Sequence, residues 1–235
     1  MSELAWLDQE LSFPAPSSAL HDPNGLLCVG GDLSPERLIL AYRTGIFPWF
    51  SEEQPILWWS PDPRCTLNWE NLKISRSMRR VINSGQFTYS FDQAFDQVIK
   101  ACAEPREYSD DTWITSDMQK AYNHLHLLGF AHSIEVWHRE RLVGGLYGIA
   151  IGRCFFGESM FSRQTNASKY AFITLAKHLQ HWGYNLFDCQ VPNPHLESLG
   201  ARALPRAEFL TILAENIDQP LNHPWQVISD LVENK

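Results

Sequence analysis

Two short apolar segments of the chain carry polar side chains that could do chemistry. Asp188 and Gln190 follow Phe187, and Glu158 lies in a Gly-Glu-Ser-Met-Phe string. Side chains alternate along a β-strand, so Asp188 and Gln190 are predicted to project the same way, and Glu158 is predicted to share a side with Phe156 and Met160. Burial of carboxylates and an amide among aromatics is costly unless they are paired or face a ligand. The pattern therefore indicates either a satisfied hydrogen-bond network at a strand end or a ligand site.

The elements around these residues predict a mixed α/β sheet, largely antiparallel. An antiparallel meander is followed by a long helix and another strand; the ranges are 132–137, 141–151, 154–160, about 166–182 and 184–191. The same order occurs in the acyl-CoA N-acyltransferase fold, where two neighbouring parallel strands splay apart around the acyl donor. By that analogy, Glu158, Asp188 and Gln190 all lie near the gap.

The first 63 residues differ in composition from the remainder. They are rich in Pro, Gly and Trp, and they contain one clear helix that starts at Ser34-Pro35 and stops at Gly45. The segment 60–63 (Ser-Pro-Asp-Pro) cannot continue regular structure. We therefore expect a small N-terminal α+β domain at 1–63 and an acyltransferase-like catalytic domain at 64–235. Further helices are expected at 75–83, 92–103, 116–128, 194–199 and 206–216, whereas the tail from Gln219 gives little signal.

Composition limits the class of protein. The net charge of −8 argues against a protein that coats itself in nucleic acid, so any such contact must be a local patch. Five scattered cysteines without a C-x-x-C pair indicate reduced thiols rather than disulfides or a zinc site. The N-terminus lacks the features of a signal peptide, and the longest apolar run, 142–151, is too short to span a bilayer. We expect a cytoplasmic protein.

Several longer strings resemble the leucyl/phenylalanyl-tRNA–protein transferase family. In the N-terminal part these are Gly30-Gly31-Asp32-Leu33-Ser34-Pro35, Gly45-Ile46-Phe47-Pro48-Trp49-Phe50 and Leu57-Trp58-Trp59-Ser60-Pro61. Later strings include Trp113-Ile114-Thr115, His132-Ser133-Ile134-Glu135-Val136-Trp137, Gly157-Glu158-Ser159-Met160-Phe161-Ser162 and Asp188-Cys189-Gln190. The resemblance runs in order from about residue 12 to 210.

The resemblance implies an activity and its partners. The family moves leucine or phenylalanine, and methionine less well, from aminoacyl-tRNA to proteins with an N-terminal Arg or Lys. The product is read as a degradation signal in the N-end rule pathway. We therefore expect contacts with the 3′ end and acceptor stem of tRNA and with such proteins, and a monomer with no membrane, metal or dissociable cofactor.

The chemistry expected of the polar residues follows from that reaction. The aminoacyl ester is already activated, so positioning, removal of a proton and protonation of the ribose oxygen remain. Gln190 cannot act as a base, but its carbonyl can accept a hydrogen bond from the attacking amine. The resemblance gives Asp188 and Gln190 a relay role, in which Asp188 orients the amide or draws positive charge through it. Glu158 suits recognition of the cationic acceptor, and an ion pair of Glu158 with Arg163 or Lys169 is the alternative.

Three further groups of residues are expected to bind substrate. The pocket for the donor side chain is assigned by resemblance to Leu146, Phe155, Met160, Phe172, Leu175 and Phe187, although ordinary core is the usual reading of such a stripe. Trp49 and Trp113, with Tyr42 nearby, are expected to stack on the terminal adenosine. Asn193 is expected to touch the acceptor. A basic cluster is predicted to dock the acceptor stem and comprises Lys73, Arg76, Arg79 and Arg80.

Three other functions remain open at this point. An acyl-CoA enzyme would need a Gly-rich loop before the long helix, but residues 162–169 contain no glycine. A non-enzymatic binder of basic N-termini or RNA would leave Asp188 and Gln190 without a task. A metal hydrolase would have to use His178 with His181 or His124 with His126; without a third ligand at suitable spacing, surface histidines are the better interpretation.

Overall fold

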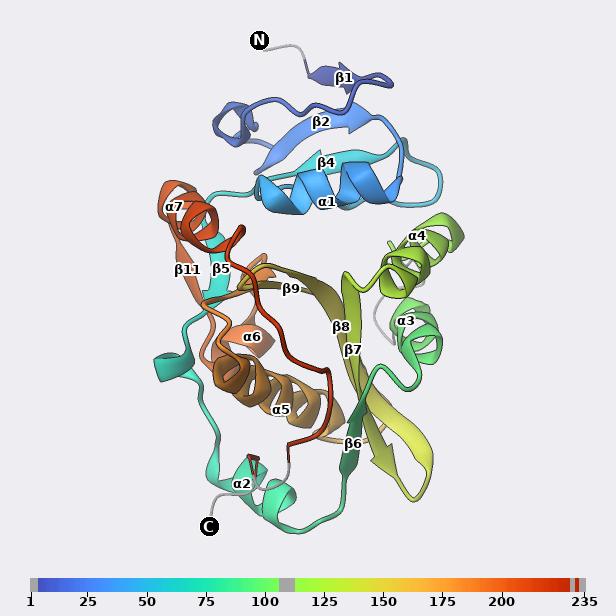
Figure 1. Ribbon diagram of the computed structural model, residues 1–235, viewed down its shortest axis with the longest axis vertical. Helices are drawn as coiled ribbons and strands as arrows, with labels where there is room; N and C mark the ends of the chain where they lie inside the picture. Colours follow the sequence, from blue (N-terminus) through green and yellow to red (C-terminus); the bar gives the residue numbers. More distant parts are fainter. Residues whose placement is uncertain (1–3, 106–112, 229–230, 233–235) are drawn as a thin grey trace.

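The computed structural model of the chain describes residues 4–105, 113–228 and 231–232. Within them lie two β-sheets, a small one of four strands near the N-terminus and a larger one of seven strands (Figure 1). The sheets follow one another along the chain, since the small sheet ends at Trp59 and the large sheet takes its first strand from Arg64. Residues 60–63 connect them.

The small sheet and one helix make up the N-terminal region. Its strand order is β1-β2-β4-β3, with β1 Ala5–Leu7, β2 Leu26–Gly30, β3 Phe47–Pro48 and β4 Leu57–Trp59. Helix α1, Pro35–Arg43, begins as predicted: the Ser34 hydroxyl accepts the Arg37 N–H, and a proline occupies the first turn. Its inner face, with Leu38, Ala41 and Tyr42, is fully buried.

The large sheet is mixed and largely antiparallel, which confirms the predicted fold class. Its order is β11-β5-β10-β9-β8-β7-β6, and among the pairings described within this sheet only that of β9 with β10 is parallel. The strands are β5 Arg64–Leu67, β6 Thr88–Phe91, β7 Ala131–His138, β8 Arg141–Ile151, β9 Cys154–Ser162, β10 Leu186–Gln190 and β11 Arg202–Leu204. The meander, helix and strand expected from the sequence are β7, β8, β9, α5 and β10.

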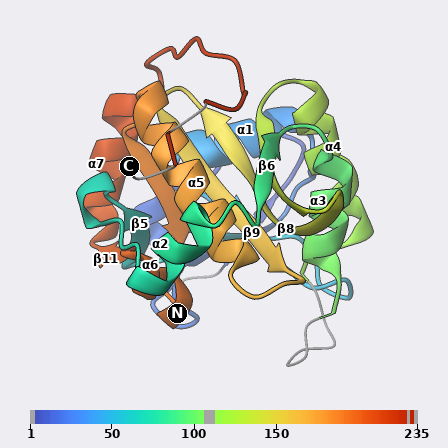
Figure 2. The same cartoon turned by 90° about the horizontal axis from the view of Figure 1, so that it is seen from below.

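Helices cover both faces of this sheet (Figures 1 and 2). Helix α5, Ala167–Trp182, lies on one face with α2, Arg76–Asn83, packed against it, and α3 and α4 lie on the other. The remaining helices are α3 Phe95–Ala103, α4 Ser116–Leu127, α6 Pro194–Leu199 and α7 Arg206–Asn216, with short 3-10 turns at Pro16–Ser18 and Trp69–Asn71. None of the helices in the described part of the chain has the length and apolar character needed to cross a membrane.

Strands β9 and β10 diverge, as the fold analogy anticipates. They pair only through Leu186–Cys154, Phe187–Phe155 and Asp188–Phe156. Beyond this point β9 continues along β8 to Ser162, whereas β10 bends away at a register irregularity between Asp188 and Gln190. The divergence opens the sheet at the positions of Glu158 and Gln190.

The C-terminal tail packs on the α5 side of the sheet, although its sequence gave little signal. It leaves α7 and passes α5 towards α2 (Figure 1). The Trp225 ring stacks on His132 at 3.9 Å, and His223 stacks on Trp182 at 4.4 Å. His178 is fully buried, and its Nε2 accepts the Ile228 N–H. The interpretation of His178 as a surface histidine is therefore wrong, because the tail covers it.

Candidate active site

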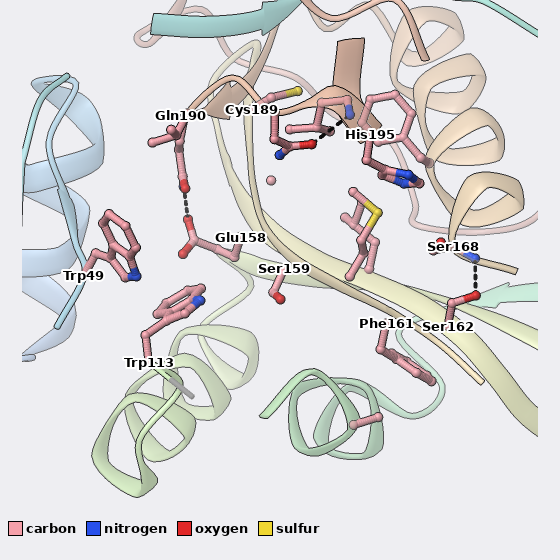
Figure 3. Close-up of a pocket in the computed structure, with 18 of the residues that line it drawn as sticks. Trp49, Trp113, Glu158, Ser159, Phe161, Ser162, Ser168, Cys189, Gln190 and His195 are labelled. Atoms are coloured by element: carbon pink, nitrogen blue, oxygen red, sulfur yellow. Dashed lines mark hydrogen bonds between the residues drawn. The ribbon is translucent and has the colours of Figure 1, made fainter. Parts of the chain in front are cut away.

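A cavity of about 910 Å³ lies where β9 and β10 diverge. The N-terminal region contributes Phe47, Pro48 and Trp49 to its wall, and the large sheet and its helices contribute the rest. Figure 3 shows Glu158, Gln190 and the two tryptophans facing it. Nine of the residues predicted to form the site line this cavity: Trp49, Trp113, Leu146, Glu158, Met160, Phe172, Phe187, Gln190 and Asn193.

Glu158 and Gln190 form a direct pair across the gap between the strands. Gln190 Nε2 donates to Glu158 Oε1 at 2.7 Å (Figure 3). When Glu158 is ionised its carboxylate only accepts hydrogen bonds, so in that state the amide nitrogen faces Glu158 and the amide oxygen faces elsewhere. The carbonyl of Gln190 is thereby set to accept a hydrogen bond from a third group. Glu158 makes the side-chain contact that orients this amide, whereas the sequence suggested Asp188 for such a contact.

A buried tyrosine pair supports the other oxygen of Glu158. Tyr122 donates its hydroxyl hydrogen to Glu158 Oε2 at 3.1 Å, and Tyr42 hydrogen-bonds Tyr122 from behind. Burial raises the pKa of Glu158 to about 7, against opposing hydrogen bonds from Tyr42, Tyr122 and Gln190. The side chain therefore changes charge near neutral pH. Glu158 forms neither of the ion pairs considered from the sequence, since Arg163 pairs with Glu104 at the cavity rim.

Asp188 is placed differently from the expectation of simple alternation. Its carboxylate is fully buried and is bound by Arg64, and Asp188 does not line the cavity. Gln190 has a φ of +61°, in the left-handed region, and it lies beyond the bulge between the two residues. An extra residue in a strand reverses the side-chain alternation, so Asp188 and Gln190 do not point the same way.

A second bulge, in β9, has the same effect on Glu158. The pairing with β8 shifts between Tyr147 and Gly148, which leaves Glu158 without a partner in the ladder. Glu158 keeps the side of Phe156, because both contact the buried tyrosines. Met160 instead packs in the cluster that holds α5, so its predicted shared side with Glu158 is wrong.

The apolar part of the cavity lies between β8, β9, β10 and the start of α5. Phe172 stacks on Phe187 at 5.1 Å, and Leu146 pairs with Met160 across the two strands. Gly157 has no side chain to displace the Phe187 ring, which would lie 3.0 Å from an added Cβ. Two predicted pocket residues, Phe155 and Leu175, are fully buried behind this wall and do not line it.

Trp49 and Trp113 line the cavity, whereas Trp58 and Trp59 do not. Trp49 follows β3 and is 44% exposed, and Trp113 precedes α4; Figure 3 shows both indoles near the Glu158–Gln190 pair. Trp58 is fully buried, and Trp59 donates its ring N–H to the Trp49 carbonyl at 2.7 Å. Tyr42 does not reach the cavity because it lies behind Tyr122.

The predicted basic cluster lies on the surface at α2, outside the cavity lining. Lys73, Arg76, Arg79 and Arg80 are all exposed. Helix α5 connects this cluster with the cavity, since α2 packs on α5 and the α5 N-terminal turn carries Ser168 in the cavity wall. On α5, the pKa of Lys177 is lowered by burial and by the charge of Arg79. Nearer the cavity, burial and the charge of Lys169 lower the pKa of His195.

Sequence reasoning missed several residues of the site. Tyr122 hydrogen-bonds Glu158 and Arg64 binds Asp188, each from a distant part of the chain. No local spacing in the sequence indicates these contacts. Cys189 and His195 line the cavity. His195 follows the Asn193 cap of α6 by two residues, and that cap was readable from the Asn-Pro pair.

The structure bears on the other functions considered. Ser162 Oγ accepts the Ser168 N–H at the start of α5, and no glycine loop precedes this helix. In the part of the chain that the structure describes, no three His, Cys, Asp or Glu side chains group as metal ligands would. The polar centre of the cavity is instead the Glu158–Gln190 pair.

Comparison with known proteins decides the family. A model described as leucyl/phenylalanyl-tRNA protein transferase matches residues 66–214, and a model of the N-terminal domain of the same proteins matches residues 31–62. This chain belongs to the leucyl/phenylalanyl-tRNA protein transferase family. A relative of that name from Hahella chejuensis is 65% identical over 98% of both chains. One from Pseudomonas fluorescens is 57% identical over 94% of this chain and 99% of its own.

Solved structures give weaker likenesses than these family members do. FemX aligns with a TM-score of 0.42 at 13% identity, over 78% of this chain and 67% of its own. L-PGS from Bacillus licheniformis aligns with a TM-score of 0.40 at 12% identity, over 68% of this chain and about half (52%) of its own. Scores below 0.5 do not establish a shared fold. The assignment to the transferase family therefore depends on the sequence matches.

Proposed function

We propose that this protein transfers leucine or phenylalanine, and methionine less well, from aminoacyl-tRNA to the N-terminal Arg or Lys of proteins. The modified proteins would enter the N-end rule degradation pathway. The family supplies the donor and the transfer to protein. The choice of Arg or Lys, a monomeric state and a cytoplasmic location are part of the proposal.

The Glu158–Gln190 pair carries this proposal. It lies in a large cavity with an apolar end and two tryptophans, and its amide oxygen is left to accept a hydrogen bond. Such a carbonyl can bind the incoming α-amine and direct its lone pair at the ester. Glu158 adds a negative charge near neutral pH, which favours the cationic end of an acceptor that begins with Arg or Lys.

The proposed reaction is nucleophilic attack of the α-amine on the ester carbonyl of the donor. The carbon–nitrogen bond forms and the bond from the carbonyl carbon to the ribose oxygen breaks. The amine loses one proton and the ribose oxygen gains one, so the step needs no outside oxidant or cofactor. An α-amine has a pKa of about 8, so a useful fraction is neutral and able to attack near pH 7.

The donor is proposed to occupy the remainder of the cavity. Phe172, Phe187, Leu146 and Met160 surround the space available to its side chain, which suits leucine and phenylalanine. The terminal adenosine would stack on Trp49 and Trp113, and base–aromatic stacking contributes about 1–3 kcal/mol per base. The acceptor stem would then follow α5 towards Arg76 and Arg80 on α2.

A transfer assay tests the function. Purified protein is mixed with tRNA charged with labelled leucine and with peptides that begin with Arg, Lys or Ala. We expect label on the Arg and Lys peptides and little on the Ala peptide. Leucyl-tRNA left intact would refute the transfer, and label on all three peptides alike would refute the acceptor preference. Label from leucyl-CoA instead would favour the acyl-CoA alternative.

A further inference from the structure

A buried ion pair joins β10, the strand that carries Gln190, to its neighbour β5. The chemistry described so far gives this pair no role. Arg64 on β5 binds Asp188 on β10 through two hydrogen bonds, Nε to Oδ1 at 2.9 Å and Nη2 to Oδ2 at 2.6 Å. Both side chains are fully buried, and neither lines the cavity. A buried pair adds little to stability compared with apolar residues, so its presence calls for another explanation.

Arg64 is held from the side of the N-terminal region. Its Nη1 donates to the Gly45 carbonyl at 3.0 Å. The guanidinium also lies over the ring of Phe47 at 4.8 Å and over that of Phe209 at 4.5 Å. Phe47 belongs to β3, the strand that leads into Trp49. One hydrogen bond from each of its three nitrogens and contacts with two rings, made by separate elements, therefore restrict the position of the guanidinium.

Asp188 connects the guanidinium of Arg64 to the backbone of Gln190. The same Oδ1 atom that binds Arg64 Nε also accepts the backbone N–H of Gln190 at 2.8 Å. The left-handed backbone of Gln190, at φ +61°, is unfavourable for a residue other than glycine. A backbone N–H that donates to an aspartate carboxylate two residues earlier stabilises such a turn. The carboxylate therefore holds the backbone that aims the Gln190 amide at Glu158.

We propose that Arg64 is a positioning residue for the transfer reaction: through Asp188 it fixes the backbone of Gln190, and so the direction of the amide. This inference depends on the proposed role of Gln190. It assigns Asp188 to the backbone of Gln190, with no charge relayed through the side chain. It also gives the N-terminal region a part in the chemistry, because that region immobilises the guanidinium.

The test compares Arg64→Lys with Arg37→Lys. Arg37 is also fully buried and paired, to Asp32 and the Asp8 carbonyl, but its contacts remain within the N-terminal region. Lysine keeps the charge and loses the two-pronged geometry. We expect Arg64→Lys to slow single-turnover transfer at saturating leucyl-tRNA by about 100-fold, the effect typical of a misplacement near 1 Å. Arg37→Lys should lower only the melting temperature.

A double-mutant cycle separates positioning from a merely structural role. If Arg64 acts through Gln190, Arg64→Lys should slow transfer less than about twofold further in a Gln190→Ala background. Additive losses would overturn the proposal, as would full-speed transfer by folded Arg64→Lys protein. Should Arg64→Lys fail to fold, Asp188→Asn serves in the same cycle, because it preserves shape and removes the charge. Absence of transfer by the unaltered protein would instead reject the function itself.

Discussion

At the scale of single residues, the site depends on a carboxylate and an amide that face each other across diverging strands. Two backbone irregularities bring them together, a bulge at Glu158 and the left-handed conformation of Gln190. Bulges of this kind are frequent next to active sites, because they redirect a side chain and bend the strand locally. Regular alternation would have pointed Gln190 to the same side as Asp188, which binds Arg64, instead of towards Glu158.

The shifted pKa of Glu158 predicts how acceptor use depends on pH. Its folded-state value, about 7, is raised from 4.5 by burial, so the carboxyl is mostly neutral at pH 6 and mostly ionised at pH 8. If the anion binds the acceptor, kcat/KM for an Arg-starting peptide should rise with pH about tenfold more in the wild type than in Glu158→Gln. The ratio of the two profiles removes the titration of the peptide amine. A flat ratio would contradict the binding role.

The same shift makes a prediction about stability. A raised folded-state pKa means that the neutral form is favoured by folding, so this contribution is complete below about pH 4.5 and is lost as the pH rises through 7. Glu158→Gln cannot ionise. The variant should therefore gain stability relative to the wild type between pH 5 and 8, as measured by urea unfolding. A constant difference over this range would show that Glu158 is not perturbed.

At the scale of elements, the sequence predicts the helices whose ends are marked by capping residues next to them in the chain. Ser34 and Ser75 cap α1 and α2 where predicted, and Gly183 ends α5 in the left-handed conformation. The helix expected at 92–103 begins later, at Phe95, because Asp92, directly after β6, has a left-handed φ of +57° that a right-handed helix does not accept. Strands of three or four residues, such as β5 and β11, carry too little periodicity to be recognised. They exist because neighbouring strands complete their hydrogen bonds.

The packing of the C-terminal tail on the large sheet can be tested at Trp225. Trp225 packs among His132, Trp182 and Phe91, so its truncation should remove buried aromatic contact. We expect Trp225→Ala to lower the free energy of unfolding by about 2 kcal/mol, since the side chain is only partly buried. Gln226→Ala, at an exposed neighbour, is the matched control. Transfer by folded Trp225→Ala should be normal, and an unchanged melting temperature would mean that the tail is not docked.

At the scale of the whole molecule, the chain combines a net charge of −8 with one exposed basic helix. Because the net charge is unfavourable for nucleic acid generally, we propose that tRNA binding is concentrated where α2 and α5 lead to the cavity. We propose the domain boundary at residue 63, between the two sheets. The cavity uses residues from both sides of it, so neither part would hold the donor alone.

Charge reversal on α2 tests this arrangement. Arg76→Glu with Arg80→Glu should weaken leucyl-tRNA binding and reduce the salt slope of log K by about 1.5, if each residue neutralises one phosphate. Arg139→Glu with Arg141→Glu changes the net charge equally, at an exposed hairpin between β7 and β8. That control should leave the slope near the wild-type value. Equal effects of both pairs would show that only total charge matters.

The most direct measurement is single-turnover transfer by Gln190→Ala beside its affinity for leucyl-tRNA. The amide is proposed to bind the attacking amine, so its loss should slow transfer by about 100- to 1,000-fold. Affinity for the donor should change less than about threefold, because Trp49, Trp113 and the apolar wall remain. Gln190→Asn, which tolerates the left-handed backbone, controls for strain and should also be slow. Equal losses of rate and affinity, or transfer at the wild-type rate, would contradict the account.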